Sequence, residues 1–298
     1  MPTTHYQQVQ PFLNYIKFEK RYSQHTLAAY QRDLEQFTEF LFTDFEAPAL
    51  NKVTSAIIRS WMAELKENGN SAKTINRKIS TLKSFFLFLM KQKEIEQTPL
   101  ATVVTPKINK RLPAFVAEKD IDTLFNYVEF NDDWKGRTDR LVLLVFYNTG
   151  MRLSELVNLK EHQVDASYSQ LKVLGKGNKE RIIPLSKELL SELKSYIADK
   201  PVKLEGVGNV FINEKGKALY DKYVYKLVKQ NLSLVTTLQK KSPHILRHTF
   251  ATHLTNSGAD INAVKELLGH SSLAATQVYT HNNIEKLKEA YKKAHPKA

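Results

Sequence analysis

The sequence predicts a mainly α-helical protein of two domains, the second of which carries a small β-hairpin or sheet. Its 298 residues correspond to roughly two domains at about 150 residues each. Apolar residues recur at helical spacing through most of the chain. A glycine-containing segment at residues 175–179 separates two short apolar runs, which is typical of a hairpin turn.

Residues 1–105 are predicted to form a small domain of four helices. The second helix begins at Ser23, a good N-cap residue, the third at Thr54 and the fourth at Ser71. Gly69 ends the third helix. Aromatic residues lie on the apolar stripes of these helices, a position more typical of core than of a ligand-stacking surface. The stripe of the first helix begins with Phe12, Tyr15, Ile16 and Phe18.

Residues 106–115 are predicted to be an extended linker. Pro106 and Pro113 disfavour helical backbone in the residues that precede them. The segment also contains Lys107, Lys110 and Arg111 and no acidic residue. An extended basic segment of this kind can lie along phosphates, and the alternative is an ordinary solvated hinge.

Residues 116–298 are predicted to form a second domain of mixed structure. Strands at residues 170–173 and 181–184 flank the hairpin turn, and another short strand is expected at residues 209–212. Residues 138–149 are predicted to form a buried helix, because large apolar side chains dominate them. The other helices are expected at residues 123–128, 153–159, 187–197, 243–257, 261–268, 273–278 and 284–293.

Charge and composition favour some classes of protein for this chain and exclude others. The net charge of +13, from 44 basic and 31 acidic residues, favours a polyanionic partner such as nucleic acid. The excess is +3 in residues 1–105, +3 in the linker and +7 in residues 116–298, so it does not come from a detached basic tail. The absence of cysteine excludes disulfides, iron–sulfur clusters and thiol nucleophiles. The longest apolar run, residues 141–146, is far shorter than the ~20 residues that cross a bilayer, and the amino terminus lacks a signal-peptide pattern.

Residues 242–253 begin a helix that is suited to binding an anion. Ser242 is a good N-cap residue, and Pro243 is a good first residue of a helix. His244 and Arg247 follow in the first turn on one face, where the helix dipole and free backbone N–H groups favour a phosphate. The alternative is a capped helix with a surface histidine and arginine.

Arg152 opens a short helix directly after Gly150, which is predicted to end the buried helix. A planar guanidinium held at such a turn can bind a phosphate through two parallel hydrogen bonds. The alternative is an arginine at a helix end that pairs with Glu155.

Lys176 lies in the hairpin turn between Gly175 and Gly177, which allow the backbone to approach a ligand closely. Lys179 and Arg181 would add to the positive field here, and a lysine whose pKa is lowered can deliver a proton. The alternative is an exposed turn lysine. The turn is not a P-loop, because the Gly-x4-Gly-Lys-Ser/Thr pattern is absent.

Two further candidates follow near the carboxyl end. Gly269 is predicted to end a helix, so that His270 lies in the elbow before the next one, and Tyr279 follows nine residues later. The alternative for Tyr279 is a packing aromatic. His248 and His253 are interpreted as packing or hydrogen-bonding residues. No carboxylate stands at the spacing of a metal site, so neither a metal nor a cofactor is expected.

Taken in chain order, the segments around Arg152, Lys176, His244 and His270 resemble those of the tyrosine site-specific recombinases, the integrase family. Within that family the resemblance is to the bacterial Xer type. The resemblance covers nearly the whole chain and fills all six positions of the family's catalytic pattern. These are Arg152 in Thr-Gly-Met-Arg-Leu, Lys176 in Gly-Lys-Gly-Asn, His244 and Arg247 in His-Ile-Leu-Arg-His, His270 in Leu-Gly-His-Ser and Tyr279 in Val-Tyr-Thr-His. It implies a SAM-like helical domain that binds DNA, a basic linker and a tyrosine recombinase catalytic domain, arranged as a C-shaped clamp around a duplex.

The resemblance also implies a role for each residue of the pattern. Tyr279 would attack a DNA phosphodiester, form a 3′-phosphotyrosyl bond and release a 5′-hydroxyl. Arg152 and Arg247 would bind the non-bridging phosphate oxygens, and Lys176 would protonate the leaving oxygen. The two histidines of the pattern would donate hydrogen bonds to the phosphate, with His244 also a base toward the tyrosine. No metal or nucleotide is required, because the covalent bond stores the cleaved linkage.

The partners that the resemblance implies are a double-stranded DNA recombination site, a second recombinase in a homo- or hetero-tetramer, and a DNA-translocase regulator. A carboxy-terminal helix at residues 283–293 would link the subunits, and the alternative is that it packs on its own domain. The expected task is resolution of chromosome dimers at cell division through a Holliday junction, in the bacterial cytoplasm at the nucleoid, with no membrane partner. The alternatives are a mobile-element integrase, a DNA invertase, a type IB topoisomerase-like enzyme, and a DNA-binding protein with a degenerate site.

Overall fold

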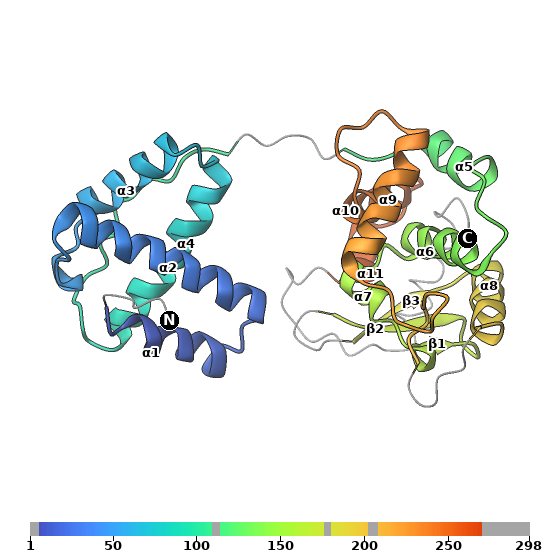
Figure 1. The fold of residues 1–298 in the computed structure, drawn as a ribbon, viewed down its shortest axis with the longest axis horizontal. Coiled ribbons are helices and arrows are strands. Elements are labelled where there is room, and N and C mark those ends of the chain that lie inside the picture. The colour runs from blue at the N-terminus through green and yellow to red at the C-terminus, as the bar shows by residue number, and fades with distance from the viewer. Residues whose placement is uncertain (1–5, 109–113, 176–179, 202–207, 270–298) are drawn as a thin grey trace. The chain divides into compact units, whose positions relative to one another are not determined.

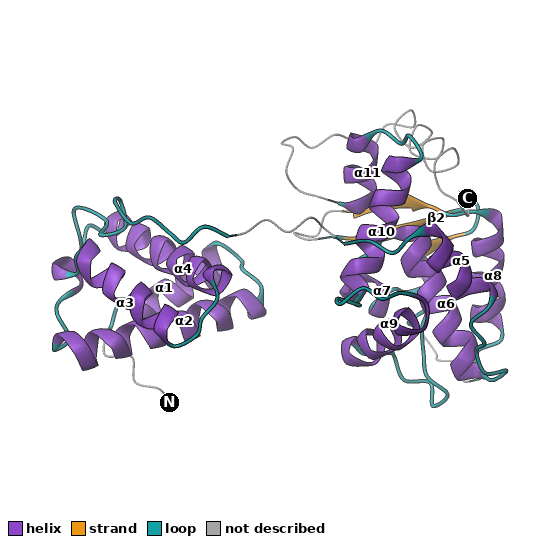
Figure 2. Cartoon of the chain, turned by 90° about the horizontal axis from the view of Figure 1, so that it is seen from above, coloured by secondary structure: helices purple, strands orange, loops and turns teal. Residues whose placement is uncertain are grey.

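The computed structural model describes residues 6–108, 114–175, 180–201 and 208–269, and the chain divides into two compact units, Met1–Arg111 and Leu112–Ala298. Both units are mainly helical, and only the second contains strands among the described residues (Figure 1; Figure 2). The predicted fold class, mainly α with a small sheet, is therefore confirmed. None of the described helices combines the length and the apolar composition needed to cross a membrane.

The described part of the first unit contains four α-helices: α1 (Val9–Asn14), α2 (Gln24–Phe45), α3 (Ser55–Glu67) and α4 (Ala72–Lys91). Side-chain caps fix where the last three begin. The hydroxyl groups of Ser23, Thr54 and Ser71 each accept a hydrogen bond from the backbone N–H three residues later, at 3.2–3.4 Å. All three predicted starts are confirmed. A single 3₁₀ turn, Leu50–Lys52, precedes α3.

The core of the first unit is aromatic, as predicted. Phe37 and Trp61, for example, are almost fully buried with ring centroids 4.9 Å apart. The prediction was wrong for Phe18, whose side chain is 65% exposed. The chain leaves α1 as a π-helix over Tyr15–Glu19. Phe18 follows the buried Ile16 by two residues, which places it on the opposite side of the helix.

A buried ion cluster connects α2 to α4. Asp33, which has no exposed surface, accepts hydrogen bonds from Arg77, from Lys78 Nζ at 3.2 Å and from Thr81 Oγ1 at 2.9 Å. Lys78 is 4% exposed, and its ammonium also donates to Gln36. Removing the charge of Asp33 would leave this buried ammonium uncompensated, which is costly in a protein interior.

Asp33→Asn is therefore expected to destabilise the first unit by about 3 kcal/mol. Urea unfolding followed by tryptophan fluorescence measures this, because Trp61 lies with its ring centroid 5.9 Å from Lys78 Nζ. Asp44→Asn, at an exposed position of the same helix, is the matched control and should change stability by less than about 0.5 kcal/mol. Equal stability of the two variants would contradict the assignment.

The second unit contains α5 (Glu118–Asn126), α6 (Trp134–Thr149), α7 (Leu153–Val157), α8 (Lys187–Ala198), α9 (Asp221–Val235), α10 (Pro243–Asn256) and α11 (Ile261–Leu268). Its sheet is antiparallel with the strand order β1 (Val164–Asp165), β2 (Gln170–Leu174), β3 (Glu180–Pro184), and a 3₁₀ turn, Glu161–Gln163, precedes β1. In the β2–β3 hairpin, Gln170 lies opposite Pro184 and Leu174 opposite Glu180. The predicted hairpin is confirmed, and β1 extends it to a three-stranded sheet.

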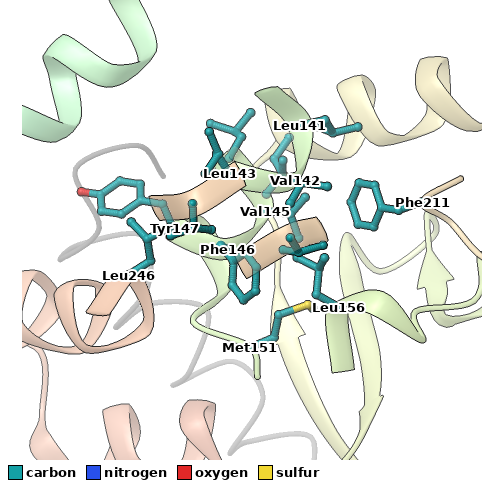
Figure 3. Close-up of a cluster of buried hydrophobic side chains, with 14 of the residues drawn as sticks. Leu141, Val142, Leu143, Val145, Phe146, Tyr147, Met151, Leu156, Phe211 and Leu246 are labelled. Carbon is teal, nitrogen blue, oxygen red and sulfur yellow. The ribbon is translucent and has the colours of Figure 1, made fainter. Parts of the chain in front are cut away.

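Helix α6 forms the centre of the second unit, as its composition predicts. Its residues 141–147 are all buried, and Met151, Phe211 and Leu246 pack around it from three other segments (Figure 3). The helix begins four residues earlier than expected, because Asp133 caps it by accepting a hydrogen bond from the N–H of Gly136 at 2.6 Å. This early start lengthens the rigid element that leads to the following turn.

Several other predictions of secondary structure were wrong. Residues 209–212 form no strand: Asn209 and Ile212 make isolated bridges with Lys160 and Ala218 instead. Helix α9 was not predicted, and α5 begins five residues earlier than expected. The predicted helices at 273–278 and 284–293, and residues 109–113 of the predicted linker, lie outside the described residues.

Candidate active site

Arg152 lies at the junction of α6 and α7. Gly150 ends α6 with a φ of +54°, and a Cβ at this position would collide with the ring of Phe250, so only glycine fits. The backbone N–H of Arg152 donates to Glu155 Oε2 at 2.6 Å, and its Nη1 donates to Glu155 Oε1 at 2.7 Å. The helix-end ion pair considered as an alternative for Arg152 therefore exists. It holds the guanidinium in place and leaves the side chain one-third exposed.

Arg247 lies in the first turn of α10 and is only 6% exposed. Its Nη1 donates to the carbonyl of Gly150 at 2.7 Å, and its Nη2 donates to the carbonyl of Leu268 at 2.5 Å. His244, three residues earlier on the same helix, is exposed. Ser242 takes the predicted N-cap position, but its hydroxyl makes no capping hydrogen bond.

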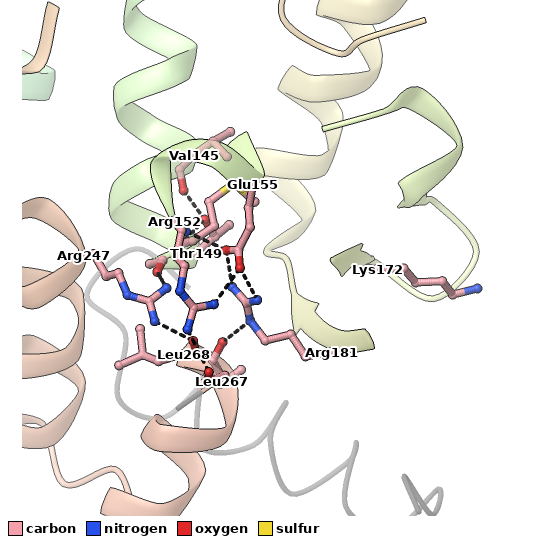
Figure 4. Close-up of polar contacts among 12 residues, drawn as sticks. Val145, Thr149, Arg152, Glu155, Lys172, Arg181, Arg247, Leu267 and Leu268 are labelled. Atoms are coloured by element: carbon pink, nitrogen blue, oxygen red, sulfur yellow. Dashed lines mark hydrogen bonds and ion pairs between the residues drawn. The ribbon is translucent and has the colours of Figure 1, made fainter. Parts of the chain in front are cut away.

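Three arginines hold the carboxyl end of α11 (Figure 4). Each of three consecutive carbonyl groups there accepts a hydrogen bond from a different guanidinium. A helix carboxyl end carries partial negative charge, so cations stabilise it. The contacts also bring Arg152 and Arg247, which are far apart in the sequence, to one place. The pairs are Leu267 with Arg181 Nε at 2.8 Å, Leu268 with Arg247 Nη2 at 2.5 Å, and Gly269 with Arg152 Nη2 at 2.9 Å.

Glu155 is the acidic residue of this arginine cluster, and its side chain is 6% exposed. Its carboxylate accepts two hydrogen bonds from Arg152 and two from Arg181. Burial raises the pKa of Glu155, but the hydrogen bonds and charges of the two arginines outweigh burial and lower that pKa to about 2. Burial, together with the charges of Arg152 and Arg181, lowers the pKa of Arg247 to about 10, so this guanidinium stays charged at neutral pH. Three guanidinium groups against one carboxylate leave the cluster positively charged.

Arg181 was predicted to add to the positive field around the hairpin, and it is one of the three guanidinium groups of the positively charged cluster, although it is buried and not on the surface. Its side chain is 4% exposed and binds Glu155 with both terminal nitrogens, at 2.8 and 2.7 Å. The alternation of β3 explains its burial, because Arg181 and Ile183 both point to the buried face while Glu180 is exposed. Sequence reasoning missed this member of the cluster, although the same alternation is visible in the sequence.

The other histidines of α10 have structural surroundings. His253 is buried, with one ring nitrogen 3.1 Å from the hydroxyl of Tyr147 and the other 2.9 Å from the carbonyl of Val116. Burial lowers the pKa of His253. Its predicted packing role is confirmed. His248 is half-buried, and burial and the neighbouring His244 lower its pKa.

Three residues of the predicted site, Lys176, His270 and Tyr279, lie outside the described residues. The strands on both sides of the turn that contains Lys176 are described, and so is Gly269, directly before His270. In the described ranges, no three His, Asp or Glu side chains gather as a metal site requires. The described part of the site is thus a rigid, positively charged arginine cluster, which is suited to holding an anion.

Comparison with known proteins identifies the family of the chain. A model described as "Phage integrase family" matches residues 114–286, and one described as "Phage integrase, N-terminal SAM-like domain" matches residues 9–93. The chain belongs to the phage integrase family. It is a site-specific tyrosine recombinase, an enzyme that cleaves and rejoins DNA.

Relatives of this integrase-family chain match it over nearly their whole length. XerC of Chlorobaculum parvum is 38% identical, over 97% of this chain and 94% of the relative. XerC of Staphylococcus saprophyticus is 39% identical over 97% of both chains. XerD of the same bacterium is 36% identical, over 97% of this chain and 99% of the relative. All three bear the name tyrosine recombinase.

Solved structures of recombinases share the fold of this integrase-family chain. The XerH recombinase in its post-cleavage complex with a palindromic difH substrate gives a TM-score of 0.69 at 24% identity, over 95% of this chain and 83% of XerH. The Tn1549 transposon integrase bound to transposon right-end DNA gives 0.68 at 19% identity, over 95% of this chain and 98% of that one. These likenesses confirm the predicted fold class.

Proposed function

We propose that this recombinase cuts DNA by forming a 3′-phosphotyrosyl bond at Tyr279, within a catalytic domain that spans residues 116–298. The observation that carries the proposal is that one helix end holds both Arg152 and Arg247. A guanidinium has five N–H donors. The side-chain contacts to protein use two terminal nitrogens of each arginine, so further N–H groups remain for the non-bridging oxygens of a phosphate.

In the proposed cleavage step, the phenolic oxygen of Tyr279 attacks the phosphorus, and the bond from phosphorus to the 5′-oxygen breaks. Lys176 gives a proton to that oxygen, and His244 takes the proton of the tyrosine. Arg152, Arg247 and His270 stabilise the negative charge that grows on the non-bridging oxygens. The 5′-hydroxyl of a second strand then attacks the phosphorus of the phosphotyrosyl bond, and the tyrosine leaves. This attack joins the two strands, and exchange between two duplexes in this way forms a Holliday junction.

The surface of α9 supports DNA binding by the second unit. Lys222, Lys226 and Lys229 are exposed at helical spacing, and Tyr225 between them is 48% exposed. A stripe of this kind can contact successive phosphates of a duplex. We place the remaining DNA contacts on the helical domain at residues 1–105 and the basic linker at 106–115, which would complete a C-shaped clamp.

The pair of relatives in Staphylococcus saprophyticus supports a role for a second recombinase, since that one bacterium has both a XerC and a XerD that resemble this chain. We therefore propose a tetramer on two duplexes, linked through the helix at residues 283–293 and regulated by a DNA translocase. The task of this tetramer would be the resolution of chromosome dimers at cell division, in the cytoplasm at the nucleoid.

The test is to map protein–DNA adducts across the chromosome of cells that make this recombinase, and then to place two copies of the mapped site on a supercoiled plasmid. The proposal predicts that purified protein, alone or with its paralogue, converts the plasmid into two smaller circles. Tyr279→Phe, which removes only the nucleophilic oxygen, should abolish this. Relaxation of the plasmid without exchange between the sites would instead identify a topoisomerase.

A further inference from the structure

Arg181 connects three parts of the second unit, although it is not one of the six pattern residues. It lies in β3, opposite Val173 of β2. Its terminal nitrogens bind Glu155 on α7, and its Nε donates to Leu267 near the end of α11 at 2.8 Å. One buried guanidinium thus joins the hairpin, α7 and α11 (Figure 4).

We propose that Arg181 is a positioning residue for DNA cleavage, which holds Arg152 and the end of α11 in the geometry that the scissile phosphate requires. The proposal rests on the function proposed above. Arg181 itself would not touch DNA, because its side chain is almost fully buried and its contacts are to protein. Its effect would pass through the groups that it fixes.

The first of these groups is Glu155. A planar guanidinium that binds both carboxylate oxygens fixes the orientation of the carboxylate as well as its position. The same carboxylate accepts hydrogen bonds from the backbone and the side chain of Arg152. Without Arg181, the carboxylate of Glu155 could rotate about its side-chain bonds, and the guanidinium of Arg152 would move with it.

The second group is the end of α11. A Cβ added at Gly269 would lie 3.0 Å from Arg181 Cδ, so the backbone here packs directly against the arginine side chain. Gly269 also accepts the hydrogen bond from Arg152 and immediately precedes His270 in the sequence. Arg181 therefore supports the attachment point of a proposed catalytic histidine.

The third group is the hairpin. Strands β2 and β3 lead into and out of the turn that contains Lys176, the proposed acid. Because Arg181 is part of β3, its bond to Glu155 ties the base of that turn to the arginine cluster. A displacement of about 1 Å between catalytic groups can reduce an enzyme's rate about 100-fold, so such a tie has kinetic consequences.

The experiment compares Arg181→Met and Arg181→Lys with the matched control Lys172→Met. Lys172 belongs to the same hairpin but is exposed and pairs with Asp165, away from the cluster. Covalent adduct formation on a nicked duplex that contains the mapped site is measured in single turnover, from neutral pH down to about pH 5. Binding of the same duplex and the folded fraction are measured in parallel.

Arg181→Met is expected to lower the adduct rate about 100-fold while changing the dissociation constant for DNA less than about twofold. Its rate should also fall further toward pH 5, because Glu155 would lose the partner that keeps it ionised there. Arg181→Lys keeps the charge but not the two-pronged contact, so its rate should stay at least about tenfold below wild type. Lys172→Met should match wild type in rate and pH profile.

An adduct rate equal to that of wild type in Arg181→Met would overturn the proposal. A lower adduct rate would also overturn it if a smaller folded fraction accounts for the decrease and the pH profile is unchanged. A second readout needs no catalysis: carboxyl NMR of the DNA-free protein should show the pKa of Glu155 rising in both Arg181 variants but not in Lys172→Met. An unchanged Glu155 titration would also overturn it. Failure of the wild type to form an adduct would count against the proposed function, while the NMR result would still decide the role of Arg181.

Discussion

Arg247→Lys is expected to lower the rate of covalent adduct formation at least about 100-fold, the usual effect of losing one preorganised donor to a transition-state charge. The guanidinium of Arg247 bridges the carbonyls of Gly150 and Leu268 and still has N–H groups for a phosphate. A lysine ammonium at the same position is a single point and cannot bridge these carbonyls in the same geometry. Charge is conserved in this variant, so DNA affinity should fall much less than the rate.

The matched control for this variant is Arg140→Lys. Arg140 is half-exposed on α6 and pairs with Glu192 at 2.8 Å, outside the arginine cluster. Single-turnover kinetics on the nicked duplex should give the wild-type rate for this control. An Arg247→Lys rate within about threefold of the control would show that the bridging geometry of Arg247 is not needed for catalysis.

Glu155→Gln is expected to destabilise the second unit by about 3 kcal/mol at neutral pH. The pKa of Glu155 is lowered from 4.5 to about 2, and each pKa unit corresponds to about 1.4 kcal/mol. Since the folded-state pKa lies below the unfolded one, this stabilisation is complete above pH 4.5 and is lost as the pH falls toward 2. The difference between wild type and variant should therefore shrink across that window.

Urea unfolding at several pH values, followed by the fluorescence of Trp134 in the second unit, measures this difference. Trp134 is suited to report on unfolding because its ring nitrogen donates to the carbonyl of Ile212 at 3.1 Å. Glu192→Gln, at a half-exposed ion pair, is the control and should cost less than about 1 kcal/mol. A Glu155→Gln difference that is constant from neutral pH to pH 2 would contradict the role of its ionised form.

The starts of three helices of the first unit were the most predictable part of the fold. Ser23, Thr54 and Ser71 mark helix starts because the signal is local, within three residues of the cap. Helix α9 begins at Asp221 after Tyr220, whose side chain makes no capping hydrogen bond. It was missed although four of its buried residues have helical spacing: Val224, Leu227, Val228 and Leu232. The strand expected at residues 209–212 failed for a different reason, since its partners are loop residues that sequence alone does not reveal.

Contacts of the candidate site were predictable where both residues belong to one short sequence motif. They were less predictable where the two residues are far apart in the sequence. Arg152 and Glu155 lie on one turn, so their ion pair was foreseen as an alternative. No local pattern indicates the pairing of Glu155 with Arg181, because it joins separate elements, and Arg181 was predicted only to add to the positive field. Composition indicated positive charge but could not separate a buried structural arginine from one that faces DNA.

The most direct test of the proposed cleavage chemistry is to identify the amino acid that becomes covalently joined to DNA. The purified recombinase is incubated with a duplex nicked beside the scissile phosphate. The protein is then digested with protease, and the peptide that stays linked to the DNA is sequenced by mass spectrometry. We expect a peptide that contains Tyr279, joined to the 3′-phosphate, and no adduct from Tyr279→Phe. An adduct on another residue, or joined to a 5′-phosphate, would contradict it, as would wild-type protein that binds the duplex and forms no adduct.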